Sequence, residues 1–238
     1  MYLNSYLSIA FTFLACSLFA QVELDEQNEI VDLPKQDFDQ IALDFTVDNF
    51  IESPTNKFST AQAPISTKLE DSRGFTFNLS YPFNIIKKNV RIAIGIGMSN
   101  FNLATNVWTW DVDSTNNYYN FTPDSLNFKK NKLLLNYVEI PLALRFMSNP
   151  NAKDNSFRIA VGYKVGYMFR SYTKVKYSDV KRKDYNIKRI NPIRHGVFAR
   201  IGFGKYFLTG FYSLTPLFEP GFGPELVPYS VGLSILTL

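Results

Sequence analysis

The chain has 238 residues, enough for one domain with long loops, and its 25 Lys and Arg against 21 Asp and Glu give a formal net charge of +4. Hydrophobic residues make up 46% of the chain, including 22 Phe and 14 Tyr, yet beyond the N-terminal segment no stretch is apolar for the roughly 18 residues that indicate a membrane helix. A single His and a single Cys exclude a disulfide framework and argue strongly against a zinc site.

Residues 1–20 are predicted to be a signal peptide. They contain no charged residue, and their apolar run Ile9–Phe19 is too short to cross a membrane as a helix. Small residues precede the expected cleavage point, so we expect cleavage after Ala20 and export to the outer membrane. The alternative is lipidation at Cys16, whose flanks loosely resemble a lipoprotein cleavage box.

Residues 21–40 form an acidic segment. They hold seven Asp and Glu against Lys35 alone, which leaves the rest of the chain basic. Such a composition is typical of a flexible segment, because it offers little apolar surface to bury. We therefore divide the chain into a signal peptide (1–20), an acidic periplasmic leader (21–40) and an outer-membrane β-barrel domain (41–238).

Residues 157–170 show the pattern from which the fold is predicted. Val, Ile, Phe and Tyr occupy the odd positions, and small or basic residues occupy most of the even ones. Because side chains of a strand point alternately to opposite faces, one face is apolar and the other is narrow and sparsely charged. Strands of soluble proteins average about 5–6 residues, whereas a tilted strand needs about 9–11 to cross a bilayer. The length of this segment favours a membrane-spanning strand.

Eight segments share this alternation: about 41–50, 73–83, 89–103, 133–147, 156–172, 194–204, 206–214 and 227–237. Short or medium connections (84–88, 148–155 and Lys205) alternate with long ones (51–72, 104–132, 173–193 and 215–226), as periplasmic turns alternate with outer loops in bacterial barrels. The sequence thus predicts an all-β fold, a transmembrane antiparallel up-and-down β-barrel of eight strands with both termini in the periplasm. An alternative is ten strands, with a further hairpin in 104–132. The segment 206–214 is clear as a strand but ambiguous in its facing.

The polar face of the predicted strands indicates a filled lumen. It is rich in Gly, Ala and Ser with scattered charges, and eight strands enclose a space that side chains fill. Charges in so narrow an interior must pair, since an unpaired buried ion costs several kcal/mol. We expect Glu139 beside one of Arg145, Arg158 or Arg200, in a structural ion-pair network or, alternatively, a gate. The predicted lumen charges are Asp44, Asp48, Arg91, Glu139, Arg145, Arg158, Lys164, Arg170 and Arg200.

The outer loops are predicted to be basic and to face the anionic phosphates of lipopolysaccharide. Each cation near an anionic surface gains about 1 kcal/mol. The alternative is an ordinary solvated loop. The residues concerned are Lys129, Lys130, Lys132, Lys174, Lys176, Lys181, Arg182 and Lys183, followed by Lys188, Arg189 and Arg194.

Signals for catalysis and for bound groups are weak. His195 has no neighbouring Ser and acid to complete an acyl-hydrolase triad. Gly95-Ile96-Gly97 lacks the third glycine and the following helix of a dinucleotide loop. Asp111-Val112-Asp113 lacks the turn glycine and the closing Glu of a calcium loop. We therefore expect no enzymatic activity, no cofactor and no metal.

Three motifs resemble the PorT-like outer-membrane β-barrel family. They are Tyr137-Val138-Glu139-Ile140-Pro141-Leu142, the glycine–tyrosine stretch 160–167 and the closing part at 202–218. The resemblance covers roughly residues 70–238 and implies an outer-membrane barrel. It implies little about activity, because most members of that family lack an assigned biochemical role, although some relatives belong to the type IX protein-secretion apparatus.

The sequence therefore predicts a non-enzymatic outer-membrane β-barrel with a filled lumen. Long extracellular loops would act in surface recognition, adhesion or membrane stabilisation. The alternatives are an accessory subunit of a type IX-like protein-secretion machine and a small solute channel. The expected partners are outer-membrane lipid and lipopolysaccharide, or the proteins of such a machine, and not nucleic acid.

Overall fold

The computed structural model describes residues 41–52, 67–86, 89–105, 130–149, 155–177 and 180–236. The chain divides into two compact units, Met1–Gln36 and Asp37–Leu238, and every described residue belongs to the second. The predicted signal peptide, the acidic leader, Lys129 and the Asp111 segment lie outside the described residues.

The described residues form nine strands and one short 3-10 helix, η1 (Leu69–Asp71). The strands are β1 (Ile41–Glu52), β2 (Arg73–Ile86), β3 (Val90–Ala104), β4 (Lys130–Met147), β5 (Phe157–Tyr177), β6 (Val180–Tyr185), β7 (Ile193–Phe203), β8 (Tyr206–Ser213) and β9 (Leu226–Leu236). Among these residues no helix has the length and hydrophobicity needed to cross a membrane.

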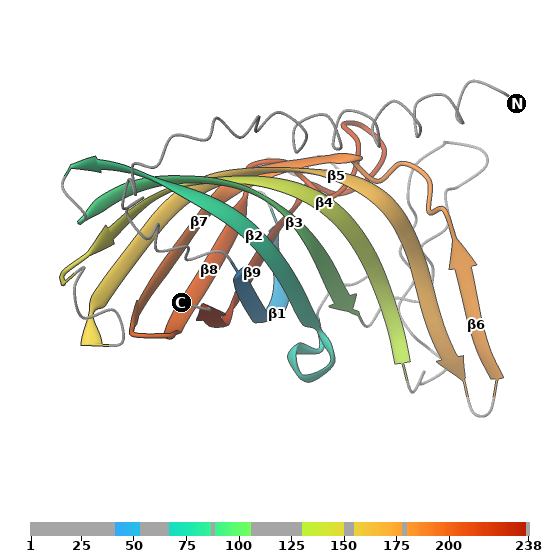
Figure 1. Cartoon of the computed structure of the whole chain (residues 1–238). Helices are drawn as coiled ribbons and strands as arrows, with labels where there is room; N and C mark the ends of the chain where they lie inside the picture. Colours follow the sequence, from blue (N-terminus) through green and yellow to red (C-terminus); the bar gives the residue numbers. More distant parts are fainter. Residues whose placement is uncertain are drawn as a thin grey trace, which may run out of the picture. The chain divides into compact units, whose positions relative to one another are not determined.

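Eight of the strands close into a barrel. Neighbours along the ring β1-β2-β3-β4-β5-β7-β8-β9 are all antiparallel, and β9 pairs with β1 from Ala42 opposite Leu236 to Glu52 opposite Leu226. Figure 1 shows the ring strands lying side by side, with β6 to one side. Because the ring is closed, its spanning strands present no open edge, and their N–H and C=O groups find partners within the barrel. The predicted eight-stranded barrel is confirmed.

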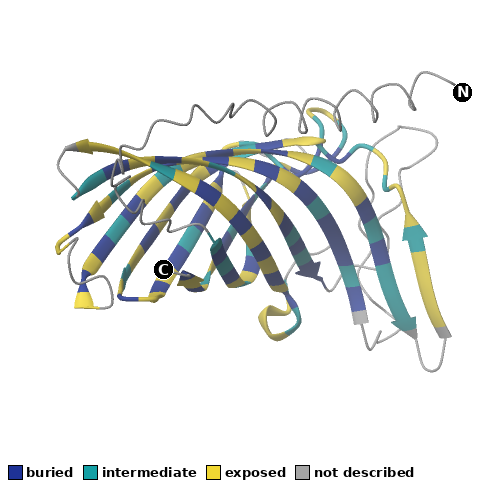
Figure 2. Cartoon of the chain, viewed as in Figure 1, coloured by how far each residue is buried: buried dark blue, intermediate teal, exposed yellow. Residues whose placement is uncertain are grey.

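The burial of side chains alternates along the ring strands, as the bands in Figure 2 show. In β3, Ala93 is 1% exposed, whereas Ile94 and Ile96 are 46% and 62% exposed. Apolar residues thus point out of the barrel and small or polar residues point in, which is the reverse of a soluble protein and the arrangement of a barrel surrounded by lipid. The same alternation settles the facing of β8: Phe207, Thr209 and Phe211 point inward.

The ten-stranded alternative is wrong. β3 pairs directly with β4, from Val90 opposite Phe146 to Ala104 opposite Lys132, so no further hairpin is inserted between these two strands of the ring. An additional strand occurs instead within 173–193, which the sequence analysis treated as a loop. There β5 continues beyond its pairing with β7, which ends at Tyr167, and remains paired with β4 as far as Lys176. On its other edge this continuation pairs with β6, from Tyr172 opposite Tyr185 to Tyr177 opposite Val180.

The two ends of the barrel differ. The short connections β2–β3, β4–β5 and β7–β8 lie at one end, here called the turn end, where β1 begins and β9 ends. The tightest of them turns at Gly204, whose φ of 57° is in the left-handed region that glycine tolerates. The longer connections and the β5–β6 hairpin lie at the opposite end, the loop end.

We expect Ile94→Arg to destabilise the barrel by about 2–4 kcal/mol, because it places a cation on the lipid-facing surface near the middle of β3. The matched control is Leu69→Arg in η1, which is similarly exposed (53%) but lies outside the strands, and should change stability by less than about 0.5 kcal/mol. Urea unfolding in lipid vesicles measures both. Equal losses would show that the outward stripe does not face lipid.

Candidate functional site

Glu139 is the centre of a buried ion cluster in the lumen. Its side chain is 1% exposed, and it accepts hydrogen bonds from Lys164 Nζ at 2.9 Å and from Arg194 Nη2 at 2.5 Å. Arg194 Nη2 also donates to Ser99 Oγ at 2.8 Å. Opposite Glu139 in the β4–β5 ladder is Gly166, where a Cβ would lie 3.1 Å from Glu139 Cγ, so the glycine leaves room for the carboxylate.

The two cations of this cluster also contact aromatic rings. The guanidinium carbon of Arg194 lies 4.0 Å from the centroid of the Tyr137 ring, and Lys164 Nζ lies 4.1 Å from that of Phe211. Cation–π contacts of desolvated groups contribute about 2 kcal/mol each. Each cation is therefore held by a carboxylate and by an aromatic face, as ions that have left water require.

A second ion pair crosses the lumen. Arg200 Nη2 of β7 lies 2.7 Å from Asp44 Oδ2 of β1, and both side chains are buried. Since β8 and β9 separate β7 from β1 in the ring, the bond links opposite parts of the wall across the interior. It fixes the distance between parts of the wall that no backbone ladder connects.

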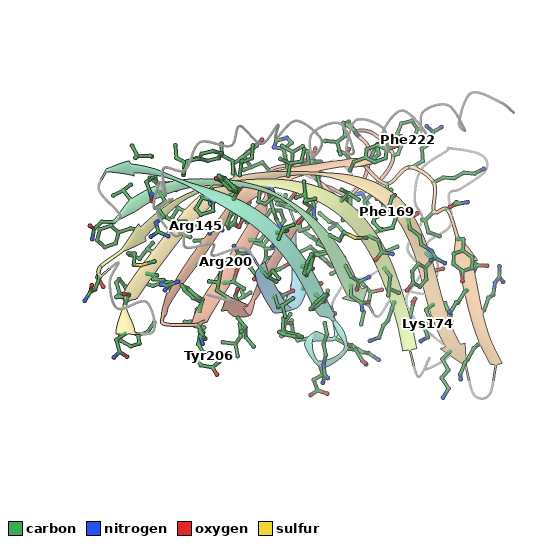
Figure 3. The ribbon with its side chains drawn as sticks, viewed as in Figure 1. Arg145, Phe169, Lys174, Arg200, Tyr206 and Phe222 are labelled. Carbon is green, nitrogen blue, oxygen red and sulfur yellow. The ribbon has the colours of Figure 1, made fainter. Side chains whose placement is uncertain are left out.

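Three further arginines lie toward the turn end. Arg91 and Arg145 are opposite each other in the β3–β4 ladder, Arg91 and Arg158 are buried, and Arg145 Nη2 donates to Ser80 Oγ at 2.6 Å. Together with Arg200 they line a cavity of about 30 Å³, which has room for a water molecule or two. Figure 3 shows Arg145 and Arg200 in the same part of the barrel, well separated from Lys174.

The predicted partner of Glu139 is wrong. Arg145 lies on the same strand about 20 Å nearer the turn end, and Arg200 pairs with Asp44 instead. The true partners are Lys164, which was among the predicted lumen charges, and Arg194, which was assigned to an outer loop. Arg194 is the second residue of β7, and its side chain points into the lumen. It therefore belongs to the barrel wall and not to the outer loop.

Of the remaining lumen predictions, Asp48 is confirmed as inward-facing and Arg170 is wrong. Asp48 is 1% exposed and accepts hydrogen bonds from Asn102 N at 2.8 Å and Thr46 Oγ1 at 2.9 Å. The β4–β5 register shifts at Tyr137, which places one extra residue in β5 and leaves Arg170 exposed on the outer side. A β-bulge of this kind reverses which residues face inward.

An apolar cluster, here called the apolar plug, fills the loop end of the lumen: Phe101, Leu103, Leu133, Leu135, Tyr137, Ile190, Leu217, Phe218 and Leu226. Ile190 and Phe218 come from the connections β6–β7 and β8–β9 and form a bridge with each other. Leu217 N donates to Leu226 O at 2.8 Å, which ties the second connection to β9. The plug was not predicted, although the alternation of β3, if continued past Met98, places Phe101 and Leu103 inside the barrel.

The β5–β6 hairpin carries four lysines on one face, here called the lysine face. Lys174 is opposite Lys183 and Lys176 is opposite Lys181, so both pairs lie on the same side of the sheet that β6 forms with β5 and β4. Arg182 lies between them in sequence but on the other side, where its Nε is 3.0 Å from Asp184 Oδ2. Like charges placed directly opposite one another are destabilising, and the hairpin has two such pairs.

The other predicted loop cations have different surroundings. Lys132 of β4 is largely buried, with Nζ 3.1 Å from Asp71 Oδ1, and Lys130 begins β4 opposite Lys176. Arg189 lies 3.5 Å from Glu219, an ion pair between the connections that supply the apolar plug. Lys132 is opposite Lys174 and so lies on the same side of the sheet as the lysine face, but it is already paired with Asp71.

His195 contacts Tyr163 rather than an acid. Its Nδ1 lies 2.7 Å from Tyr163 Oη on the outer side of β5 and β7. Within the described ranges no three His, Cys, Asp or Glu side chains are grouped as metal ligands. The geometry of His195 is that of a polar residue at the rim of the apolar outer surface.

Comparison with known families identifies the class of protein that this closed, outwardly apolar barrel defines. Residues 46–219 match the model of the outer membrane protein beta-barrel domain. The chain belongs to that family and is a protein of the outer membrane.

Solved structures with similarity to the chain include Ail, the attachment invasion locus protein of Yersinia pestis. The identity is 11% and the TM-score 0.36, with 83% of this chain and 97% of that chain covered. Ail in complex with the heparin analogue sucrose octasulfate aligns over the same shares, with 12% identity and a TM-score of 0.33. No curated protein matches the chain.

We expect Glu139→Gln to destabilise the protein by about 3–5 kcal/mol, because it leaves Lys164 and Arg194 buried without a negative charge. Adding Lys164→Met should recover part of that loss. The control is Asp184→Asn, which breaks the exposed pair with Arg182 and should cost about 0–1 kcal/mol. Urea unfolding in lipid vesicles measures all three, and a loss from Glu139→Gln no larger than that of the control would contradict the role of the cluster.

Proposed function

We propose that this outer-membrane barrel is non-enzymatic and non-conducting, and that it acts by surface recognition through its loop end. The observation that carries the proposal is the combination of a filled lumen with a hairpin that continues beyond the ring. Bacterial outer-membrane barrels have short turns in the periplasm and longer loops outside, which places the loop end at the cell surface. Export through a signal peptide cleaved after Ala20 is part of the same proposal.

The filling of the lumen argues against solute passage. The apolar plug occupies the loop end, the Glu139 cluster lies below it, and the Arg200–Asp44 pair spans the interior nearer the turn end. A solute would have to displace packed apolar side chains and then separate buried ions, each of which costs several kcal/mol. A barrel of eight strands has no space around these groups for an aqueous path.

The β5–β6 hairpin supports a role at the surface. Asn186 N donates to Ser171 O at 2.9 Å, so the hairpin is anchored at its base, and residues 181–183 are exposed. Stable lysine pairs at such a site require a solvent or ligand that offsets their repulsion. The ligands that suit this surface are the anionic groups of outer-membrane lipid and lipopolysaccharide.

A second candidate is an accessory subunit of a protein-secretion machine of type IX. It rests on the resemblance of Tyr137–Leu142 and residues 160–167 to the PorT-like family. Glu139 of that motif is the centre of the lumen cluster. The packing of the barrel therefore explains the motif, and the motif alone does not indicate a secretion machine.

In planar bilayers we expect the purified protein to give no steady open channel. Leu217→Ala with Phe218→Ala removes buried side chains from the apolar plug and should produce brief openings. Leu214→Ala in the same connection should not, because Leu214 is 51% exposed and points away from the lumen. Steady currents from the unmutated protein would contradict the proposal and favour a solute channel.

Shortening the hairpin separates the two candidate functions. Replacing residues 172–185 by a two-residue turn also removes the β5 partners of residues 130–134 in β4. It should leave the rest of the ring intact, because Ser171 and Asn186 are already hydrogen-bonded. We expect the variant to keep its heat-modifiable migration on gels, to lose binding of intact cells to anionic surfaces, and to leave protein secretion unchanged. Loss of secretion with surface binding retained would favour the accessory subunit.

A further inference from the structure

We propose that the lysine face, with the arginine and tyrosines beside it, binds the phosphate groups of lipids in the leaflet surrounding the loop end. This rests on the proposed function in one respect, that the loop end lies on the outer side of the membrane. It adds which groups of the lipid are bound, the phosphates, and which face of the hairpin binds them.

The outward face of β5 changes in character along the strand. Val165, Tyr167 and Phe169 are 43%, 63% and 50% exposed and continue the apolar stripe of the barrel wall. Arg170 comes next, followed on the same side by Tyr172, Lys174 and Lys176. The order is an apolar side chain, then aromatic rings with Arg170 among them, then the two lysines. This is the order in which hydrocarbon, interface and phosphate succeed one another in a membrane.

The bulge in β5 is what places the lysines on this face. Before it, odd-numbered residues such as Tyr167 point outward, and Lys164 points into the lumen. After it, Ser171 and Thr173 are buried and the even-numbered residues point outward. Without the extra residue Lys174 and Lys176 would lie on the lumen side, like Lys164. The bulge therefore turns four positive charges toward the membrane instead of toward the interior.

The height of the lysine face fits the headgroup region. Lys174 is about 17 Å along the strand from Phe169, which is about 12 Å along the membrane normal at a tilt near 45°. A lysine side chain reaches several ångströms toward a nearby anion while its stem lies along apolar surface. Its ammonium group thus comes within reach of phosphates just above the aromatic rings.

The neighbouring groups are arranged in advance for anions. The Tyr172 and Tyr185 rings lie 5.6 Å apart, and the Arg170 guanidinium carbon is 5.5 Å and 5.2 Å from their centroids. Arg170 is thereby held beside the lysine pairs, and phosphate is a ligand that guanidinium groups bind with two hydrogen bonds. On the opposite face Arg182 is already bridged to Asp184 at 3.0 Å. The lysine face is therefore better suited to bind an anion than the opposite face, where Arg182 already has a carboxylate partner.

The direction of the face favours a lipid over a soluble partner. Because the lysines continue the lipid-facing stripe of β5, they lie on the side of the sheet that faces the surrounding lipids. Phosphates of the surrounding leaflet are present at high local concentration at this height, and each lysine near such a surface strengthens binding about fivefold.

The test uses the full chain in nanodiscs of phosphatidylcholine that contain a small fraction of lipid A. Native mass spectrometry of the released protein measures how many lipid A molecules it retains. We expect retention of bis-phosphorylated lipid A and not of lipid A from which both phosphates have been removed. Lys181→Gln with Lys183→Gln should weaken retention about 25-fold. Neither residue belongs to the ring, so the barrel of this variant should assemble normally.

The matched control is Arg182→Gln, compared with Lys183→Gln alone. Each removes one positive charge from adjacent positions of β6, but from opposite faces. We expect Lys183→Gln to weaken retention about fivefold and Arg182→Gln to leave it unchanged. Equal effects of the two changes, equal retention of phosphate-free lipid A, or preferential binding of soluble inorganic polyphosphate would each overturn the proposal.

The outcome separates this inference from the proposed function. If the shortened hairpin leaves surface recognition intact while the lysine variants lose lipid A, surface recognition through the hairpin is wrong and the lipid site stands. If recognition is lost with the hairpin while Lys183→Gln and Arg182→Gln retain lipid A equally, the lipid site is wrong and the proposed function stands.

Discussion

The structure depends on one constraint, that a backbone crossing hydrocarbon must find all its hydrogen-bond partners within the protein. The seam between β1 and β9 meets it, because without that ladder both strands would be edges exposed to lipid. Eight strands close this ring, and the number of strands fixes the width of the interior. The contents of the lumen follow from that width.

A narrow lumen can be filled only where large and small residues face each other. At Gly162 an added Cβ would lie 2.7 Å from the ring of Phe198 on the next strand, so the aromatic side chain occupies the space that the glycine leaves. Gly196 and Phe211 repeat this arrangement one strand further on. The ions occupy the remaining space and are paired across it, which is why the proposed recognition surface is at the loop end and not in the lumen.

The class of fold and the facing of most strands could be predicted, because alternation is a local property and the lipid makes it unambiguous. The strand at 156–172 shows the limit. Up to Tyr167 the alternation places each residue correctly, but the bulge at Phe169 depends on pairing with Tyr137 and leaves no mark in the sequence of β5 alone. The prediction for Arg170 failed for that reason. The partners of Glu139 could not be ranked either, since the stagger between strands decides which charges share a level.

The same seam has a consequence for the order of events in time. β1 is the first ring strand to be synthesised and its partner β9 is the last. Asp44 of β1 pairs with Arg200, which follows it by 156 residues. Contacts so distant along the chain form slowly, because the loop between them must close before any of them stabilises it. The first strand therefore remains without its final neighbour until synthesis and export are nearly complete. During that interval the outward apolar side chains of β1 are exposed to water, so the barrel must close faster than the chain aggregates. The chain is therefore prone to aggregation until β9 pairs with β1.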